Sequence, residues 1–141
     1  MQVTLLLSTL LVTQYHKEVQ MENTIVWFEI PVIDLDRAMK FYSDVMGVEF
    51  HLQEDENSKM AFFPFEQGTA GGALVLSEGY VPTNTGAVIY LNGGADLSEQ
   101  LGRVESAGGK ITIPKMSIGE NGFFAHFEDT EGNRVALHSM G

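Results

Sequence analysis

Cysteine is absent from this sequence of 141 residues. Thiol catalysis, disulfide bonds and cysteine-based zinc sites are therefore excluded, and a cytoplasmic location fits this composition. Cationic residues are also scarce, because eight Lys and Arg stand against 19 Asp and Glu, giving a formal net charge of −11. A protein that follows a phosphate backbone needs clustered cations. The composition therefore argues against a nucleic-acid partner.

The N-terminal segment lacks an apolar run long enough to cross a membrane. Its apolar stretch, residues 3–12, is interrupted by Thr4, Ser8 and Thr9 and is shorter than a bilayer span. No basic residue precedes the stretch and no small-residue cleavage site follows it, as a secretory signal requires. We expect residues 1–20 to be an extension that forms an extra strand or packs against a partner; a signal peptide is the alternative. No membrane partner is expected.

Residues 24–47 contain one strand followed by one helix. Apolar and mixed positions alternate over residues 26–32, which is the period-two pattern of a strand with two different faces. Asp34 occupies the position of a helix N-cap, apolar residues follow at helical spacing, and Gly47 can adopt the left-handed conformation that ends a helix.

The same order of elements occurs twice in the domain, residues 21–141. Three strands follow the first helix, and a linker at 79–86 separates them from a second strand, a second helix capped by Asp96, and three more strands. The two helical segments, 34–47 and 96–109, have one length. We therefore predict an α+β fold of two βαβββ repeats, residues 24–78 and 86–139, forming a curved mixed sheet with the helices on its convex side.

Side-chain alternation predicts which face of the sheet packs against the helices and which face is open to a ligand. One parity is apolar in every strand and should pack under the helices: Phe28, Ile30, Phe50, Leu52, Leu74, Leu76, Ile89, Leu91, Phe123, Phe127, Val135 and Leu137. The opposite parity mixes aromatic rings with polar groups: Trp27, Glu29, His51, Tyr90, Asn92, Phe124, His126, Glu128, Arg134, Ala136 and His138. This second composition is typical of a small-molecule pocket.

Three stretches resemble the vicinal oxygen chelate superfamily, which contains glyoxalase I, extradiol dioxygenases and bleomycin-resistance proteins. They are IPVIDLDRAMKFYSDVMGVEF, AGGKI after the second helix, and HFEDTEGNRVALHS at the end. The resemblance covers residues 24–140 and implies the paired βαβββ fold and, for many members, a homodimer. The fold alone does not imply one chemistry.

Enzymes of this superfamily usually hold one divalent metal on the concave face through His, Glu or Gln. Counting from Asp34 and Asp129, the resemblance places two ligand positions at Trp27 and Ala136, and it places their counterparts in the other two strands at about Val75 and near Val88. Indole, isopropyl and methyl groups do not coordinate divalent cations. We therefore expect no metal or other cofactor, as in the members that bind a ligand without chemistry.

Glu29, His126 and His138 are the candidate catalytic residues, because a carboxylate and imidazoles on one face can act as an acid–base pair. The alternatives are that they orient a ligand, or that Glu29 pairs with Arg134 or with a histidine across the sheet. Trp27 and Phe124 could stack a planar ligand or fill the cavity.

Tyr90 and Asn92 could donate hydrogen bonds to a bound group, although Asn92 could instead cap the turn before Asp96. The leading interpretation is a cytoplasmic, homodimeric small-molecule binding protein. The first alternative is a lyase, isomerase or dioxygenase-type enzyme that uses Glu29 with His126 or His138, either without a metal or with relocated metal ligands. A further alternative is a structural subunit whose pocket has collapsed.

Overall fold

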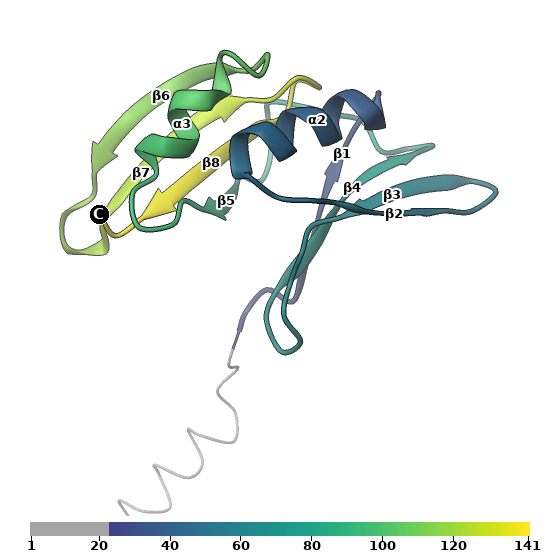
Figure 1. The fold of residues 1–141 in the computed structure, drawn as a ribbon, viewed down its shortest axis with the longest axis horizontal. Helices are drawn as coiled ribbons and strands as arrows, with labels where there is room; N and C mark the ends of the chain where they lie inside the picture. The colour runs from purple at the N-terminus through teal and green to yellow at the C-terminus, as the bar shows by residue number, and fades with distance from the viewer. Residues whose placement is uncertain (1–22) are drawn as a thin grey trace, which may run out of the picture.

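The computed structural model describes residues 23–141, so the prediction for residues 1–20 lies outside the described residues. Two helices, eight strands and one short 3-10 helix are found in this range (Figure 1). In chain order they are β1 (Trp27–Pro31), α2 (Leu35–Met46), β2 (His51–Glu54), β3 (Ser58–Phe62), β4 (Gly71–Ser77), β5 (Ile89–Asn92), α3 (Ser98–Val104), β6 (Lys110–Ser117), η1 (Gly119–Asn121), β7 (Phe123–Glu128) and β8 (Arg134–Ser139). Neither helix is long and apolar enough to cross a membrane.

The two predicted βαβββ repeats are confirmed. The first forms a four-stranded sheet in the order β1-β4-β3-β2, and the second repeats this order as β5-β8-β7-β6. In each sheet the first strand pairs in parallel with the fourth strand of its repeat, and the other neighbours are antiparallel. The expected curved sheet is therefore divided into two hydrogen-bonded halves. Helix α2 packs against the first sheet and α3 against the second, and the two helices pack against each other (Figure 1).

Helix α2 begins and ends where the sequence indicates. The Asp34 side chain accepts a hydrogen bond from the Arg37 backbone N–H, and Gly47 is left-handed at the C-terminal end, with φ 68°. Its buried residues follow the predicted stripe and include Ala38, Tyr42 and Val45. Glycine suits the last position because other residues adopt a positive φ at a steric cost.

Helix α3 is shorter than predicted. It has seven residues, starts at Ser98 and has no side-chain cap at its first position, whereas α2 has 12 residues. The Asp96 carboxylate does accept from the Ser98 N–H, but it also binds Lys115. Beyond Val104 the chain continues as hydrogen-bonded turns to Gly109, so the predicted equal length holds for the segment and not for the helix.

The apolar parity packs into one core under the two helices. Most of the predicted residues are buried or lie against the core, including Ile30, Leu74, Phe127 and Leu137. Leu52 is the exception, because 45% of it is exposed. It lies on β2, the edge strand of the first sheet and the strand farthest in that sheet from β1, and every residue of β2 is exposed.

A polar turn of the second repeat fastens the two repeats together. The Glu131 carboxylate accepts from the backbone N–H groups of Ile33 and Asp34 and from the Arg37 guanidinium, at 2.7–2.9 Å. Its side chain is fully buried. Asp129 accepts from the Tyr42 hydroxyl at 2.5 Å. These bonds fix the start of α2, and thereby the end of β1, against the loop between β7 and β8.

The pKa values in this turn follow from burial and from the donors present. Burial alone raises the pKa of Glu131, but the hydrogen bonds from Arg37, Asp34 and Ile33 outweigh it and leave the pKa below its ordinary value. For Asp129 burial outweighs the donors and raises the pKa. Glu131 is therefore held as a carboxylate at neutral pH.

Candidate functional site

An open pocket lies at the start of β1, on the face of the first sheet that turns away from the helices. Its volume is about 670 Å³, and three of its walls are the rings of Trp27, Phe62 and Phe65. The Trp27 ring lies 5.6 Å from Phe62 at 55° and 6.0 Å from Phe65 at 83°. The remaining lining residues are Glu49, Phe50, His51, Gln53, Phe63 and Pro64. Tilted and edge-to-face contacts are the usual packing geometry of aromatic pairs, so the three rings form one continuous aromatic wall of an open pocket.

Strand register explains why these rings meet. Trp27 on β1 lies opposite Gly71 on β4, while Phe62 on β3 lies opposite both Ala73 on β4 and His51 on β2. A Cβ atom at Gly71 would come within 2.9 Å of both the Trp27 and the Phe65 rings. Glycine at this position therefore allows the two rings to lie over the β4 backbone.

Glu29 lies beside this pocket on the same face of β1. Its carboxylate accepts from the Tyr80 hydroxyl at 2.8 Å and from the Trp27 indole N–H at 3.3 Å. The hydrogen bond to Glu29, and the nearby negative charge, raise the pKa of Tyr80. Neither Arg134 nor a histidine is a hydrogen-bond partner of Glu29 in the described residues. The carboxylate instead orients the indole.

The second sheet carries a different group on its corresponding face. The Tyr90 hydroxyl and His126 Nε2 are 3.0 Å apart, with the rings in edge-to-face contact, and the Phe124 ring lies edge-on to the same imidazole at 5.5 Å. Burial, together with the positive charge of Arg134, lowers the pKa of His126. Its Nδ1 is buried and has no hydrogen-bond partner in the described structure. The imidazole is therefore neutral at neutral pH.

The structure divides the predicted site residues into separate groups. Trp27 and Glu29 lie together on the first sheet, and Tyr90, Phe124 and His126 lie together on the second. His138 lies on the same face of the second sheet, opposite Phe124 in the β7–β8 register, and its Nε2 is 2.6 Å from the backbone oxygen of Asn121. The three candidate acid–base residues thus have different hydrogen-bond partners. Trp27 and Phe124, predicted to stack one ligand, lie on different strands of different sheets.

Asn92 takes the second of the two roles considered for it. Its side-chain oxygen accepts from the Gly94 N–H at 2.9 Å, while its backbone oxygen accepts from the Gln100 side chain. The side chain therefore closes the turn that leads into α3.

The metal of the superfamily enzymes does not fit the residues at its expected positions. Trp27 and Val75 are on the first sheet, Val88 precedes β5, and Ala136 is fully buried in β8. None of these side chains has an atom that coordinates a divalent cation. Residues 23–141 also contain no group of three His, Asp or Glu side chains placed to hold a metal ion.

Three residues of the first group were missed by the sequence reasoning. Phe62 had a usable signal, because it has the parity that faces away from the helices once β3 is paired with β4. Phe65 lies just beyond the end of β3 and so has no strand parity. Tyr80 lies in the linker, where nothing in the sequence indicates that it returns to Glu29, 51 positions away.

Comparisons with known proteins agree with the fold. Residues 24–137 match the Glyoxalase/Bleomycin resistance protein/Dioxygenase superfamily. A glyoxylase-like domain-containing protein from Didymella fabae is 36% identical over 115 residues, which make up 77% of this chain and 88% of that protein.

Solved structures give the same result. Glyoxalase I from Zea mays superposes with a TM-score of 0.62 at 25% identity, covering 82% of this chain but 44% of the maize chain, so the chain spans less than half of that protein. TnmS3, an antibiotic binding protein from Streptomyces sp. CB03234, superposes with a TM-score of 0.57 at 23% identity and covers 86% of this chain and all of that one. By its sequence match and its paired βαβββ repeats, the chain belongs to the glyoxalase/bleomycin resistance protein/dioxygenase superfamily.

Proposed function

We propose that this protein binds a small molecule with a flat apolar part, held against Trp27 in the pocket of the first sheet. The observation that carries the proposal is the arrangement of Trp27, Phe62 and Phe65 around an open volume of about 670 Å³. This volume lies within the range of about 300–1,000 Å³ that small-molecule pockets occupy. Phe65 and Trp27 remain 53% and 36% exposed, so their rings are accessible to a ligand.

The surroundings of Trp27 support a fixed binding wall. Glu29 accepts a hydrogen bond from the indole N–H and is itself held by the Tyr80 hydroxyl, and Gly71 leaves room for the ring over β4. A side chain that is already oriented loses little conformational freedom when a ligand binds. The fold is compatible with such a role, since the antibiotic binding protein TnmS3 shares it.

Tryptophan fluorescence tests the proposal directly, because Trp27 is the single tryptophan of the chain. A library of planar aromatic compounds is titrated into the purified protein while tryptophan emission is recorded. The melting temperature is measured as well, since a ligand that binds the folded state raises the melting temperature. Binding that changes the emission and is lost in Trp27→Ala supports the proposal. Binding that survives in Trp27→Ala, but is lost in the Phe124→Ala control, would move the site to the second sheet.

The proposal extends to a homodimer. Large hydrophobic side chains are exposed on the open face of the second sheet as well, with Tyr90 52% and Met116 50% exposed. Exposed apolar groups gathered on one face are typical of an interaction surface. Light scattering on the purified protein should give twice the mass of the chain, about 31 kDa from a chain of 15.5 kDa; a mass of one chain would contradict a dimer.

Proton transfer at His126 is a second candidate function. The observation that favours it is the 3.0 Å contact between the Tyr90 hydroxyl and Nε2 of the mostly buried His126, whose pKa burial lowers. A neutral imidazole can accept a proton from a substrate carbon next to a carbonyl, and Tyr90 can relay or return it. The chemistry belongs to the lyase and isomerase classes.

Deuterium incorporation tests this second candidate without a known product. Hydroxyketones and 2-oxoaldehyde adducts are incubated with the protein in heavy water, and exchange of the carbon-bound proton is followed by NMR. Exchange that falls at least about 100-fold in His126→Gln, and less in Tyr90→Phe, supports a base role for His126. Equal exchange with and without the protein would contradict a proton-transfer function for His126.

A further inference from the structure

We infer that the ligand of the Trp27 pocket is an organic cation, and that the pocket discriminates against anions. This inference rests on the proposed function and adds the charge of the ligand to it. The inference is drawn from aromatic rings with accessible faces that lie next to carboxylates. Among the described residues, no Lys or Arg lines this pocket.

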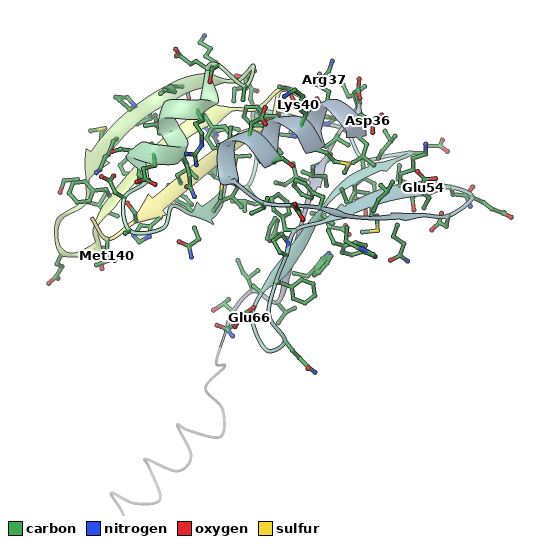
Figure 2. All side chains as sticks on the ribbon, in the orientation of Figure 1. Asp36, Arg37, Lys40, Glu54, Glu66 and Met140 are labelled. Carbon is green, nitrogen blue, oxygen red and sulfur yellow. The ribbon has the colours of Figure 1, made fainter. Side chains whose placement is uncertain are left out.

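Among residues 23–141 the lining of the pocket contains one carboxylate, that of Glu49, one imidazole, that of His51, and no Lys or Arg. Two further carboxylates lie close to its walls. Glu29 accepts the hydrogen bond of the Trp27 indole, and Glu66 follows Phe65 at the end of the first sheet, in the loop that leads toward β4 (Figure 2). The potential around the rings is therefore negative.

None of the seven Lys and Arg side chains among residues 23–141 lines the pocket. Arg103, Lys110 and Arg134 belong to α3 and the second sheet. Arg37, Lys40 and Lys115 form ion pairs with Glu131, Asp44 and Asp96, all outside the pocket lining. Lys59 on β3 lies opposite Leu76 on β4, and Leu76 is five residues after Gly71, the residue opposite Trp27. Lys59 is also three residues from Phe62 on β3 and so has the opposite parity, which places its side chain on the other face of the sheet, where it lines a separate hollow with Arg37 and Leu76. Its partner Glu54 lies at the other end of this sheet from Glu66 (Figure 2).

Aromatic faces and carboxylates attract the same kind of ligand. The π-face of an aromatic ring is negative, and tryptophan binds cations most strongly of the three aromatic residues. Rings that meet at 55° and 83° present faces from different directions, as a cation requires. An anion would find no cationic partner in the lining and would be repelled by Glu49. The ligand class is thus a planar or quaternary ammonium cation with an apolar body.

Three probes of similar shape and different charge test the inference: N-methylquinolinium, quinoline at pH 8, and quinoline-2-carboxylate. Affinities are measured by calorimetry on the full chain. We expect the cation to bind about tenfold more tightly than quinoline, and the carboxylate to bind most weakly. The preference for the cation should decrease as salt is raised, because the carboxylates lie at the surface.

Two variants separate the charge from the ring. Glu49→Gln should weaken N-methylquinolinium about threefold and leave quinoline unchanged, whereas Glu105→Gln, an exposed control with the same change in net charge, should alter neither. Trp27→Leu keeps an apolar side chain without a π-face, so it should retain quinoline and lose most of the cation preference.

The outcomes are distinguishable. Equal binding of the cation and quinoline, abolished by Trp27→Ala, overturns the cation inference and leaves the proposed binding function in place. Tighter binding of the carboxylate overturns the inference as well. If no probe binds and emission of Trp27 never changes, both the inference and the proposed function fail.

Discussion

The two repeats share one topology but differ in what their open faces carry. The first presents an aromatic pocket with carboxylates at its border, and the second presents a neutral, mostly buried imidazole held by Tyr90. The starts of the two helices are also held differently. Glu131 of the second repeat binds the start of α2, whereas α3 has no side-chain cap at its first position. Duplication therefore preserved the scaffold while the two faces and the two helix ends became different.

This difference indicates how β1, the strand that carries Trp27 and Glu29, is kept in position. β1 ends just before the backbone N–H groups that Glu131 accepts from, and Asn133 donates a hydrogen bond to the backbone oxygen of Pro31 at 2.7 Å. The strand that carries Trp27 and Glu29 is thus positioned by the turn of the other repeat.

The largest effect is expected from removing the charge of that turn. Glu131→Gln should lower the free energy of unfolding by about 2–4 kcal/mol, because an amide cannot accept all of the bonds that the buried carboxylate accepts from Ile33, Asp34 and Arg37. Urea unfolding measures the change. The exposed Glu105→Gln control should stay within about 0.5 kcal/mol of the natural chain. A loss no larger than that of the control would mean that the turn does not fasten the repeats.

Lowering the pH should remove the difference in unfolding free energy between the natural chain and Glu131→Gln. The folded-state pKa of Glu131 lies below its ordinary value of 4.5, so its contribution is present above pH 4.5 and is lost as the pH falls toward the folded-state pKa. Asp129 has the opposite sign, since its raised pKa makes the ionised form costly in the folded state.

Comparison of the natural chain with Glu131→Gln isolates the Glu131 contribution. The difference in unfolding free energy should be constant from pH 8 to about pH 5.5 and shrink below about pH 4.5. A difference that grows on acidification would contradict the assignment.

A smaller effect should distinguish the two helix starts. Asp34→Ala removes the side-chain cap of α2 and should cost about 1 kcal/mol. Asp96→Ala should reduce stability less than Asp34→Ala does. Its bonds to Ser98 and Lys115 are exposed to solvent, and they do not cap the first position of α3. Thermal melts of the two variants test the order, and an equal or larger loss for Asp96→Ala would reverse the comparison.

The smallest effect is expected from metal removal. The family resemblance predicts the metal-ligand positions at Trp27, Val75, Val88 and Ala136, and these side chains do not coordinate cations. Dialysis against a chelator should therefore leave the melting temperature and the binding of N-methylquinolinium unchanged. Elemental analysis of the untreated protein provides the control. A stoichiometric metal whose loss lowers the melting temperature would reveal ligands that lie elsewhere.

Local patterns by themselves determined much of this protein. Alternation gave the strands and their buried faces, Asp34 and Gly47 gave the limits of α2, and the repeated order of elements gave the paired βαβββ fold. These features depend on neighbours within a few residues, so the sequence contains their cause. The residues of the open faces followed from the same parity.

Tertiary structure alone decided which of those residues meet. Tyr80 reaches Glu29 across 51 positions and Glu131 reaches Asp34 across 97, and such contacts depend on how two sheets and a linker pack. Polar residues in the DTEG turn have the composition of any exposed turn, yet Asp129 and Glu131 are buried. Separation of Trp27 from Phe124 has the same origin. Parity assigns a side chain to a face, but the relative placement of two sheets is set by packing between their helices.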